Sequence, residues 1–281
     1  MRIAAPFHLP APLRALLLGV ALLPALSAQA EVKLDVPYIV THNDTVHRML
    51  EMAEVTPDDV LVDLGSGDGR IVIQAALDWG IRDGLGVDID PERVAEARAA
   101  ARAAGVDDRV RFIQGDLFEL DFSNATVLTM YLLEALNLRL RPVILERLAP
   151  GTRVISHVFG MGDWKPDQTV LSRGIPAHLW IVPAKVQGQW RIELPDGSHE
   201  VVDFYQRYQE IEGSYVLDGI THGMNFAKLR GTHIRFSARD RHYIGRIDGN
   251  RMSGLPGPGV VPRWHAERIR AETSARAPLA Y

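Results

Sequence analysis

A short apolar run that ends in alternating glycines constrains the fold of this chain more than any other feature. Residues 60–64 read VLVDL and lead directly into the loop Gly65-Ser66-Gly67-Asp68-Gly69. Glycines after a strand let the backbone turn tightly near a ligand, and a helix that begins there presents its N-terminus to the same place. Residues 71–77 continue with helical spacing. The three pieces predict a strand, a loop and a helix, the start of a parallel α/β sheet.

The same alternation of strand and helix patterns continues to about residue 160. Further strands are expected over 85–88, 110–114, 125–131 and 153–159. Asp90 is predicted to cap a helix that has Pro91 at its first position and ends before Gly105. Another helix is expected over 138–148, with Pro142 in its first turn because a later proline would break it. The pattern predicts a Rossmann-like sheet with helices on both faces.

The pattern changes near residue 184. Helical spacing ends, and short alternating segments such as 234–237 and 243–247 are separated by Gly-containing turns. This predicts a small antiparallel β-domain, either a barrel or a sandwich. The expected division is a first domain over 31–183, a β-domain over 184–271 and a flexible tail over 272–281.

The first thirty residues have the composition of a secretory signal peptide. Arg2 and Arg14 precede an apolar run over 15–26, and Ala28-Gln29-Ala30 offers a small-residue cleavage site. We therefore expect residues 1–30 to be removed and the protein to be exported, in bacteria to the periplasm. The alternative is an uncleaved leader that anchors the protein in the membrane, although its apolar run is shorter than a span of about 20 residues. No later segment approaches that length, so no stable membrane span is expected after cleavage.

Charge and composition exclude several classes of function. The 281 residues contain no Cys, so disulfides, iron–sulfur clusters and thiolate zinc sites are excluded. Residues 31–183 contain 15 Lys and Arg against 24 Asp and Glu. An acidic domain of this kind is not expected to bind nucleic acid and would suit a cationic substrate. His and carboxylate residues do not have the spacing of a metal site, so no metal is predicted. The oligomeric state is left open.

Acidic residues follow the next two strands and favour a nucleotide-like ligand. Asp88 ends the strand about twenty residues after the glycines, where a carboxylate can accept ribose hydroxyls, and Asp116 follows the next strand. The glycine spacing is not the Gly-x-Gly-x-x-Gly of dinucleotide sites, because residue 70 is Arg. Asp63 and Asp68 beside the loop suit a cofactor without phosphates better than a pyrophosphate.

Three motifs in order resemble those of class I S-adenosylmethionine-dependent methyltransferases. They are Asp63-Leu64-Gly65-Ser66-Gly67-Asp68-Gly69-Arg70, Gly86-Val87-Asp88-Ile89-Asp90 and Gly115-Asp116-Leu117-Phe118. Pro37-Tyr38, Thr41, Tyr131-Leu132-Leu133, Asn137 to Pro142 and Gly162 to Pro166 further resemble the mitochondrial lysine methyltransferases of the ATP synthase c-subunit and the adenine nucleotide translocase. Val158 and Gly160 depart from that group, where aspartates are expected.

The resemblance implies a role for each matched residue. The cofactor S-adenosylmethionine would have Gly65, Ser66, Gly67 and Gly69 around its methionine part, Asp63 near its amino group, Asp88 and Ile89 at its ribose, and Asp116 and Leu117 at its adenine. Tyr38, Tyr131 and Asn137 are the candidate catalytic residues. For Tyr131 the alternative is a packed aromatic, and for Asn137 a helix cap. His157 is either a base or a buried, hydrogen-bonded histidine.

The expected activity is N-methylation of a protein lysine or another amine, so the expected partner is a protein or a small amine. Tyr131-Leu132-Leu133-Glu134 is not the Asn/Asp-Pro-Pro-Tyr/Phe of adenine or glutamine methylation. The alternative is an exported, non-catalytic protein that retains the methyltransferase scaffold for binding or assembly. The departures at Val158 and Gly160 favour that alternative.

Overall fold

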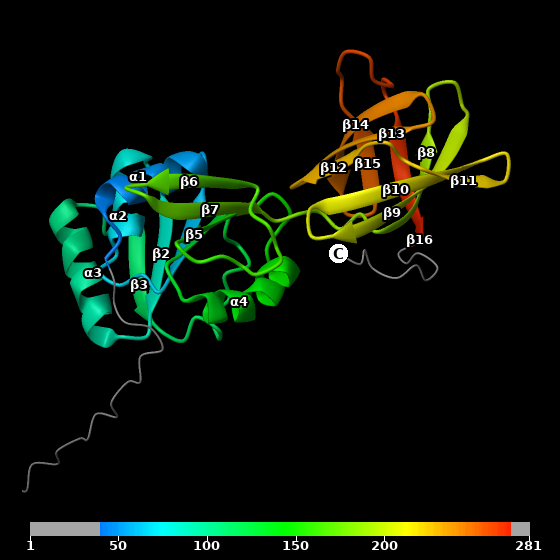
Figure 1. The fold of residues 1–281 in the computed structure, drawn as a ribbon. Helices are drawn as coiled ribbons and strands as arrows, with labels where there is room; N and C mark the ends of the chain where they lie inside the picture. Colours follow the sequence, from blue (N-terminus) through cyan, green and yellow to red (C-terminus); the bar gives the residue numbers. More distant parts are fainter. Residues whose placement is uncertain (1–39, 271–281) are drawn as a thin grey trace, which may run out of the picture. The chain divides into compact units, whose positions relative to one another are not determined.

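The computed structural model describes residues 40–270, whose first part is a seven-stranded mixed sheet (Figure 1). The strand order is β3-β2-β1-β4-β5-β7-β6, in which β1 to β5 are parallel and β7 and β6 are antiparallel. The bounds are β1 Val60–Leu64, β2 Asp83–Asp88, β3 Val110–Gln114, β4 Val127–Met130, β5 Arg153–His157, β6 Gln168–Ser172 and β7 Ile175–Ile181. The order reverses direction at β1 and β4, so a crevice is expected beyond the carboxyl ends of those strands.

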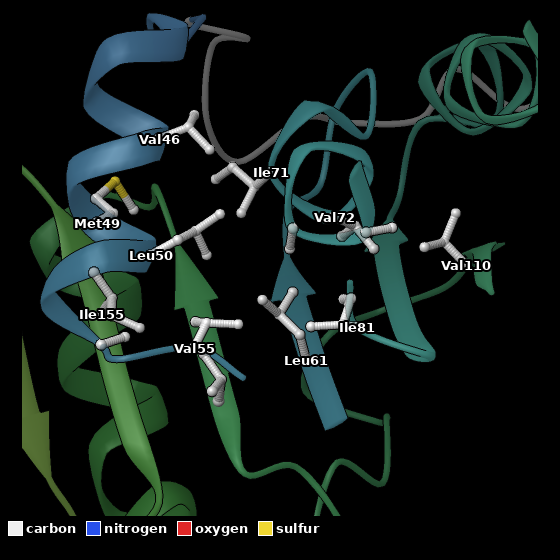
Figure 2. Close-up of a cluster of buried hydrophobic side chains, with 14 of the residues drawn as sticks. Val46, Met49, Leu50, Val55, Leu61, Ile71, Val72, Ile81, Val110 and Ile155 are labelled. Atoms are coloured by element: carbon white, nitrogen blue, oxygen red, sulfur yellow. The ribbon is translucent and has the colours of Figure 1, made fainter. Parts of the chain in front are cut away.

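Four helices cover both faces of this sheet. They are α1 Asn43–Met52, α2 Arg70–Asp78, α3 Pro91–Ala104 and α4 Glu134–Arg147. Successive strand residues point to opposite faces, so Leu61 packs in one buried cluster with α1 to α3, while Val62 packs in another with α4. Figure 2 shows side chains of the first cluster, among them Met49 and Leu50 on α1 and Leu61 on β1. This confirms the predicted α/β sheet.

The termini of α3 are also as predicted. The Asp90 carboxylate accepts a hydrogen bond from Glu92 N at 2.8 Å, Pro91 is the first helical residue, and Gly105 ends the helix at φ 68°. The helix α4 differs from the prediction, because it begins four residues earlier, at Glu134, and so holds Pro142 in its interior. The proline leaves the Leu138 carbonyl without its helical donor, but Leu138 is 38% exposed and water can supply one.

The second sheet contains nine antiparallel strands in the order β11-β10-β9-β8-β16-β15-β14-β13-β12. The bounds are β8 Gly188–Glu193, β9 His199–Arg207, β10 Glu210–Leu217, β11 Ile220–Gly223, β12 Ala227–Arg230, β13 His233–Ala238, β14 Arg241–Asp248, β15 Arg251–Gly254 and β16 His265–Arg270. Strand β10 also contacts β12 from the far end of the order, so the sheet curls into a half-barrel. Trp190, Phe204, Phe236 and Trp264 form its buried core.

The chain passes from one sheet to the other between Ile181 and Gly188. The predicted division at residues 183 and 184 falls in this connection and stays a prediction. The predicted signal peptide over 1–30 and the tail over 272–281 lie outside the described residues. Within residues 40–270, every helix is too short or too polar to cross a membrane.

Candidate functional site

A pocket lies where the parallel strands end, and it contains most of the predicted cofactor residues. Its lining includes Asp63, Gly65, Ser66, Gly67, Asp88, Ile89, Asp116, Leu117 and Tyr131. Five aspartates and two arginines line it, so its charge is predominantly negative. The sheet positions these side chains, because β1, β2 and β3 are adjacent and parallel and their carboxyl ends meet at one edge.

The glycine loop follows β1 and adopts a backbone conformation that few other residues accept. Gly65, Gly67 and Gly69 all have positive φ, of 76°, 51° and 79°. The N–H groups of Gly65 and Ser66 both donate to the carbonyl of Val87 on β2, at 2.8 and 2.9 Å. A Cβ at Gly69 would lie 2.6 Å from the ring of Phe112. The loop is therefore fixed against β2 and β3 before any ligand binds.

Asp88 ends β2 and faces the glycine loop. Its carboxylate accepts hydrogen bonds from Gly67 N at 2.7 Å and from Asp90 N at 3.0 Å. These two donors fix the side chain at the wall of the pocket and leave acceptor capacity for further donors. A ribose, which offers two neighbouring hydroxyl donors, fits that capacity.

Asp116 and its neighbours form the adjoining wall after β3. One oxygen of Asp116 accepts from Phe118 N at 2.8 Å, so the carboxylate is held by its own turn. Ile89 is 41% exposed and supplies an apolar surface beside Asp88. The guanidinium of Arg139 lies 3.8 Å from the centre of the Phe118 ring. An apolar wall with one carboxylate suits a flat ring that carries an amine.

Asp63 is the most deeply buried acid of the pocket, with 2% exposure. Thr129 Oγ1 donates to its carboxylate at 2.7 Å. Burial raises the pKa of Asp63 to about 7; the Thr129 hydrogen bond opposes that rise, and the nearby carboxylates of Asp88 and Asp68 add to it. A bound ammonium would favour the ionised form of this carboxyl group.

Tyr131 and Thr41 lie at the end of the pocket that approaches β4 and β5. Tyr131 directly follows β4 and lines the pocket, and Thr41 precedes α1. Both contact His157, the last residue of β5: the Tyr131 and His157 ring centres are 4.3 Å apart, and Thr41 Oγ1 is 3.2 Å from His157 Nδ1. Tyr38, a further candidate catalytic residue, lies outside the described residues.

Two predicted residues are not in the lining. Asn137 is buried in the first turn of α4, so the helix-cap alternative is wrong. Its side-chain amide donates towards Ser156 Oγ, Phe159 O and Gly160 O at 3.1 to 3.2 Å, and it thereby holds the segment after β5. Gly69 directly precedes α2, and it packs against the Phe112 ring, which leaves no room for a Cβ atom.

The lining also contains residues that the sequence argument did not select, among them Val40, Arg70, Leu132 and Leu136. The motif did contain Arg70, whose guanidinium pairs with Asp68 and donates to the Thr41 carbonyl at 3.0 Å. Leu132 lies in the segment Tyr131-Leu132-Leu133 that carries the family resemblance, but no local motif marks Leu136 as a pocket residue. For His157 the sequence leaves open a base or a buried, hydrogen-bonded histidine. Its contacts with Thr41 and Tyr131 depend on tertiary structure.

The residues present fit S-adenosylmethionine. Its ammonium and sulfonium are cations, and the pocket supplies carboxylates and backbone carbonyls but no described lysine. The orphaned hydroxyl of Ser66, buried beside the glycine loop without a partner among the described residues, offers a further polar contact. The described residues show no group of three or more His, Asp or Glu arranged to hold a metal ion.

Comparisons with known proteins agree with this fit. Residues 63–168 match the family described as the ANTKMT methyltransferase domain. A protein-lysine N-methyltransferase of Saccharolobus islandicus (strain REY15A) is 46% identical over 135 residues, which are 48% of this chain and 84% of that protein. The adenine nucleotide translocase lysine N-methyltransferase of Mus musculus is 32% identical over 135 residues, and the match spans 58% of its length.

A solved structure shows a similar fold over about half of this chain. It is an RNA methyltransferase from Salinibacter ruber in complex with S-adenosyl-L-homocysteine, 53% identical, with a TM-score of 0.51. The match covers 53% of this chain and 96% of that one. Each of these relatives leaves about half of this chain unmatched.

Proposed function

Because this chain belongs to the ANTKMT family of S-adenosylmethionine-dependent methyltransferases, we propose that it methylates the side-chain amine of a protein lysine. The observation that carries the proposal is the 46% identity to a protein-lysine N-methyltransferase over 84% of that protein. The acidic pocket supports it, since a cationic lysine is attracted to carboxylates.

The cofactor residues divide the binding task along the pocket. Asp116 and Leu117 would hold the adenine, Asp88 and Ile89 the ribose, and the glycine loop with Asp63 the methionine part. When bound, S-adenosylmethionine supplies an electrophilic methyl group on a sulfonium. Methyl transfer from a sulfonium to an amine needs no covalent nucleophile from the protein. The protein therefore acts by holding the two reactants in line and by excluding water.

The acceptor amine must reach the site without its proton. The pKa of a lysine side chain is near 10.4, so at neutral pH its nitrogen is mostly protonated and has no free lone pair. Only the neutral amine can react. Desolvation beside the Tyr131 and Phe159 rings, whose centres are 6.5 Å apart, lowers that pKa. With the cofactor bound, a carbon–nitrogen bond would form in place of the methyl carbon–sulfur bond, and the resulting ammonium would release its proton to water.

Cofactor binding and methyl transfer are tested separately. Calorimetry with S-adenosylhomocysteine should show binding to the full chain, and Asp88→Ala should abolish it because the carboxylate at the pocket wall is lost. Transfer is followed with radiolabelled methyl groups onto poly-L-lysine and purified basic proteins. Unchanged binding by Asp88→Ala would contradict the assignment of the pocket.

RNA is a second acceptor class to test, because the Salinibacter ruber structure is described as an RNA methyltransferase. The same radiolabel assay with total RNA separates the two classes. Binding of S-adenosylhomocysteine without transfer to protein or RNA would favour the non-catalytic alternative.

We also propose that the protein is exported, on the basis of the leader-like residues 1–30. Export raises a question of supply, because S-adenosylmethionine is made in the cytosol. An anchored leader with its basic end inside would still place the pocket outside the cytosol. Cell fractionation with N-terminal sequencing tests the proposal: a mature chain that begins at Glu31 is expected, and a cytosolic chain that begins at Met1 would contradict it.

A further inference from the structure

His157 occupies a position between the cofactor pocket and the end of β5. Its ring is buried, with 4% exposure, and it contacts two residues of the pocket lining that come from different parts of the chain. The Tyr131 ring lies against it at 4.3 Å with a tilt of 57°, and Thr41 Oγ1 lies 3.2 Å from Nδ1. These contacts place the imidazole directly behind the wall that faces an incoming acceptor.

The backbone after His157 is strained in a way that fixes this position. Val158 has φ 69°, which is unfavourable for a β-branched residue. Phe159 N donates to the His157 carbonyl at 2.9 Å, so the three residues form the rarer, positive-φ γ-turn. Val158 N donates to Pro176 O at 2.9 Å and ties the turn to β7. A strained turn persists where surrounding contacts over-determine it, often at a functional site.

One nitrogen of the ring has no partner. His157 Nε2 is buried and makes no hydrogen bond to any residue in the described range 40–270. A buried polar atom without a hydrogen bond destabilises the folded state. The opposite nitrogen is engaged by Thr41, so the ring has one edge satisfied and one edge available.

The imidazole is neutral at physiological pH. Burial lowers the pKa of His157 to about 4, with a smaller electrostatic contribution from the nearby His42. Within residues 40–270, Tyr131 after β4 contacts the ring and His42 beside α1 acts on it electrostatically, and neither is a carboxylic acid that would favour an imidazolium. So weak a base cannot take the proton of a lysine ammonium, but a neutral imidazole is a good hydrogen-bond acceptor.

We propose that His157 orients the acceptor amine: Nδ1–H donates to Thr41 Oγ1, and Nε2 accepts an N–H of the neutral amine. The amine's lone pair is then left to point along the pocket towards the methyl group. Tyr131 lines the pocket and its ring centre lies 4.3 Å from that of His157, so an amine in the pocket would approach Nε2 past the Tyr131 side chain. This inference rests on the proposed amine methylation and assigns the hydrogen-bond acceptor that such a reaction requires.

Three variants separate the two nitrogens. His157→Gln places an amide oxygen near the Nε2 position, His157→Asn places one near Nδ1, and His157→Phe keeps the ring contact with Tyr131 without either nitrogen. We expect kcat/KM for poly-L-lysine to fall roughly 100-fold in His157→Phe and His157→Asn, and His157→Gln to recover most of that loss. Calorimetric affinity for S-adenosylhomocysteine should stay within about 2-fold of wild type. Recovery by His157→Asn but not by His157→Gln would overturn the proposal in favour of a structural link to Thr41.

The pH profile separates orientation from base catalysis. Because His157 is neutral above pH 5 or so, its replacement by Gln should lower kcat without moving the pH profile between pH 6 and 9. A limb near pH 6 to 7 that disappears in His157→Gln would show a general base and overturn the proposal.

A spectroscopic readout does not depend on the variants folding. In the full chain with ¹⁵N-labelled histidine and saturating S-adenosylhomocysteine, His157 should appear as the neutral Nδ1–H tautomer, and its Nε2 resonance should shift when a lysine-containing peptide is added. The Nε2–H tautomer, or no shift at saturating peptide, contradicts the proposal. If wild type transfers no methyl group to any amine, the proposed function fails and this inference with it. If wild type transfers but all three variants match it, only this inference fails.

Discussion

The buried Asp63 carboxyl group lowers the stability of the folded protein, and we expect it to strengthen the binding of a ligand ammonium. A carboxyl group whose pKa is raised from 3.8 to about 7 in the folded state is held neutral there, so its ionisation opposes folding. In the protein without ligand, this contribution lowers the free energy of unfolding as the pH rises from about 4 through 7. The cost is on the order of a few kcal/mol, since each pKa unit corresponds to about 1.4 kcal/mol.

The variant Asp63→Asn should therefore be more stable than wild type at pH 8 and close to it at or below pH 4, because the amide keeps the Thr129 hydrogen bond and cannot ionise. Its affinity for S-adenosylhomocysteine should fall roughly 10- to 100-fold, since the ligand ammonium loses its counter-charge. Urea unfolding across this pH range and calorimetry measure the two effects. The exposed Asp58→Asn is the control, and equal pH dependence in wild type and Asp63→Asn would contradict the argument.

Val158 carries strain that another side chain would relieve. Asn tolerates positive φ better than a β-branched residue, so Val158→Asn should raise the free energy of unfolding by about 1 kcal/mol. Urea unfolding measures the change. Val170→Asn, within β6, is the matched control and should lower stability, because Val170 packs against the first buried cluster. A loss of stability in Val158→Asn would show that the valine side chain contributes more than its backbone costs.

Sequence reasoning found the cofactor side of the pocket because its residues lie in local motifs. The glycine loop, Asp88 and Asp116 each follow a strand, and parallel strands bring such ends together. The acceptor side has no such rule. Thr41, Tyr131 and His157 come from three separate segments, and only the packed sheet shows that His157 joins the other two.

At the scale of elements, the parallel strands were predictable and the antiparallel ones of the first sheet were not. Residues 60–64 and 127–130 are almost wholly buried and read as apolar runs. Strand β6, by contrast, is largely exposed and polar, so its pairing with β7 depends on the completed sheet rather than on its own pattern. The helix α4 begins at Glu134 and not at the expected residue 138, so Pro142 lies in its interior. Water can hydrate the turn at Leu138, which is exposed, and supply the hydrogen bond that the proline cannot donate.

Strand β2 lies so close to its neighbours that it depends on a residue without a side chain. A Cβ at Gly86 would lie 2.4 Å from Phe112 Cδ1 and 2.7 Å from Ser66 Oγ. Gly86→Ala should lower the free energy of unfolding by about 1 to 3 kcal/mol through overpacking, and should weaken S-adenosylhomocysteine binding by displacing Ser66. Thermal unfolding and calorimetry measure both.

Gly115→Ala, directly after β3, is the control for stability, since the nearest atom to its Cβ, Val87 Cγ1, would be 3.9 Å away. Its stability should be close to that of wild type. Equal losses in the two variants would mean that flexibility, and not space, determines the need for glycine in this sheet.

At the scale of the whole molecule, the two sheets have separate buried clusters. We expect them to unfold as separate cooperative units, with two transitions in scanning calorimetry. S-adenosylhomocysteine at 100 times its Kd should stabilise only the unit that contains the pocket, by about 2.7 kcal/mol. Asp88→Ala should remove the shift. A single transition that moves as a whole would contradict the predicted division near residue 183.

The acidic lining of the pocket also has a consequence for turnover. The pocket is lined by Asp63, Asp88 and Asp116. The cofactor proposed to bind there, S-adenosylmethionine, loses one positive charge when its methyl group is transferred. The spent cofactor is therefore attracted less strongly than the fresh one, by about 1 kcal/mol or more for a single charge near a carboxylate. Competition calorimetry at low salt should show tighter binding of S-adenosylmethionine than of S-adenosylhomocysteine. Methyl transfer therefore lowers the affinity of the pocket for the cofactor product, which favours dissociation of S-adenosylhomocysteine after each turnover.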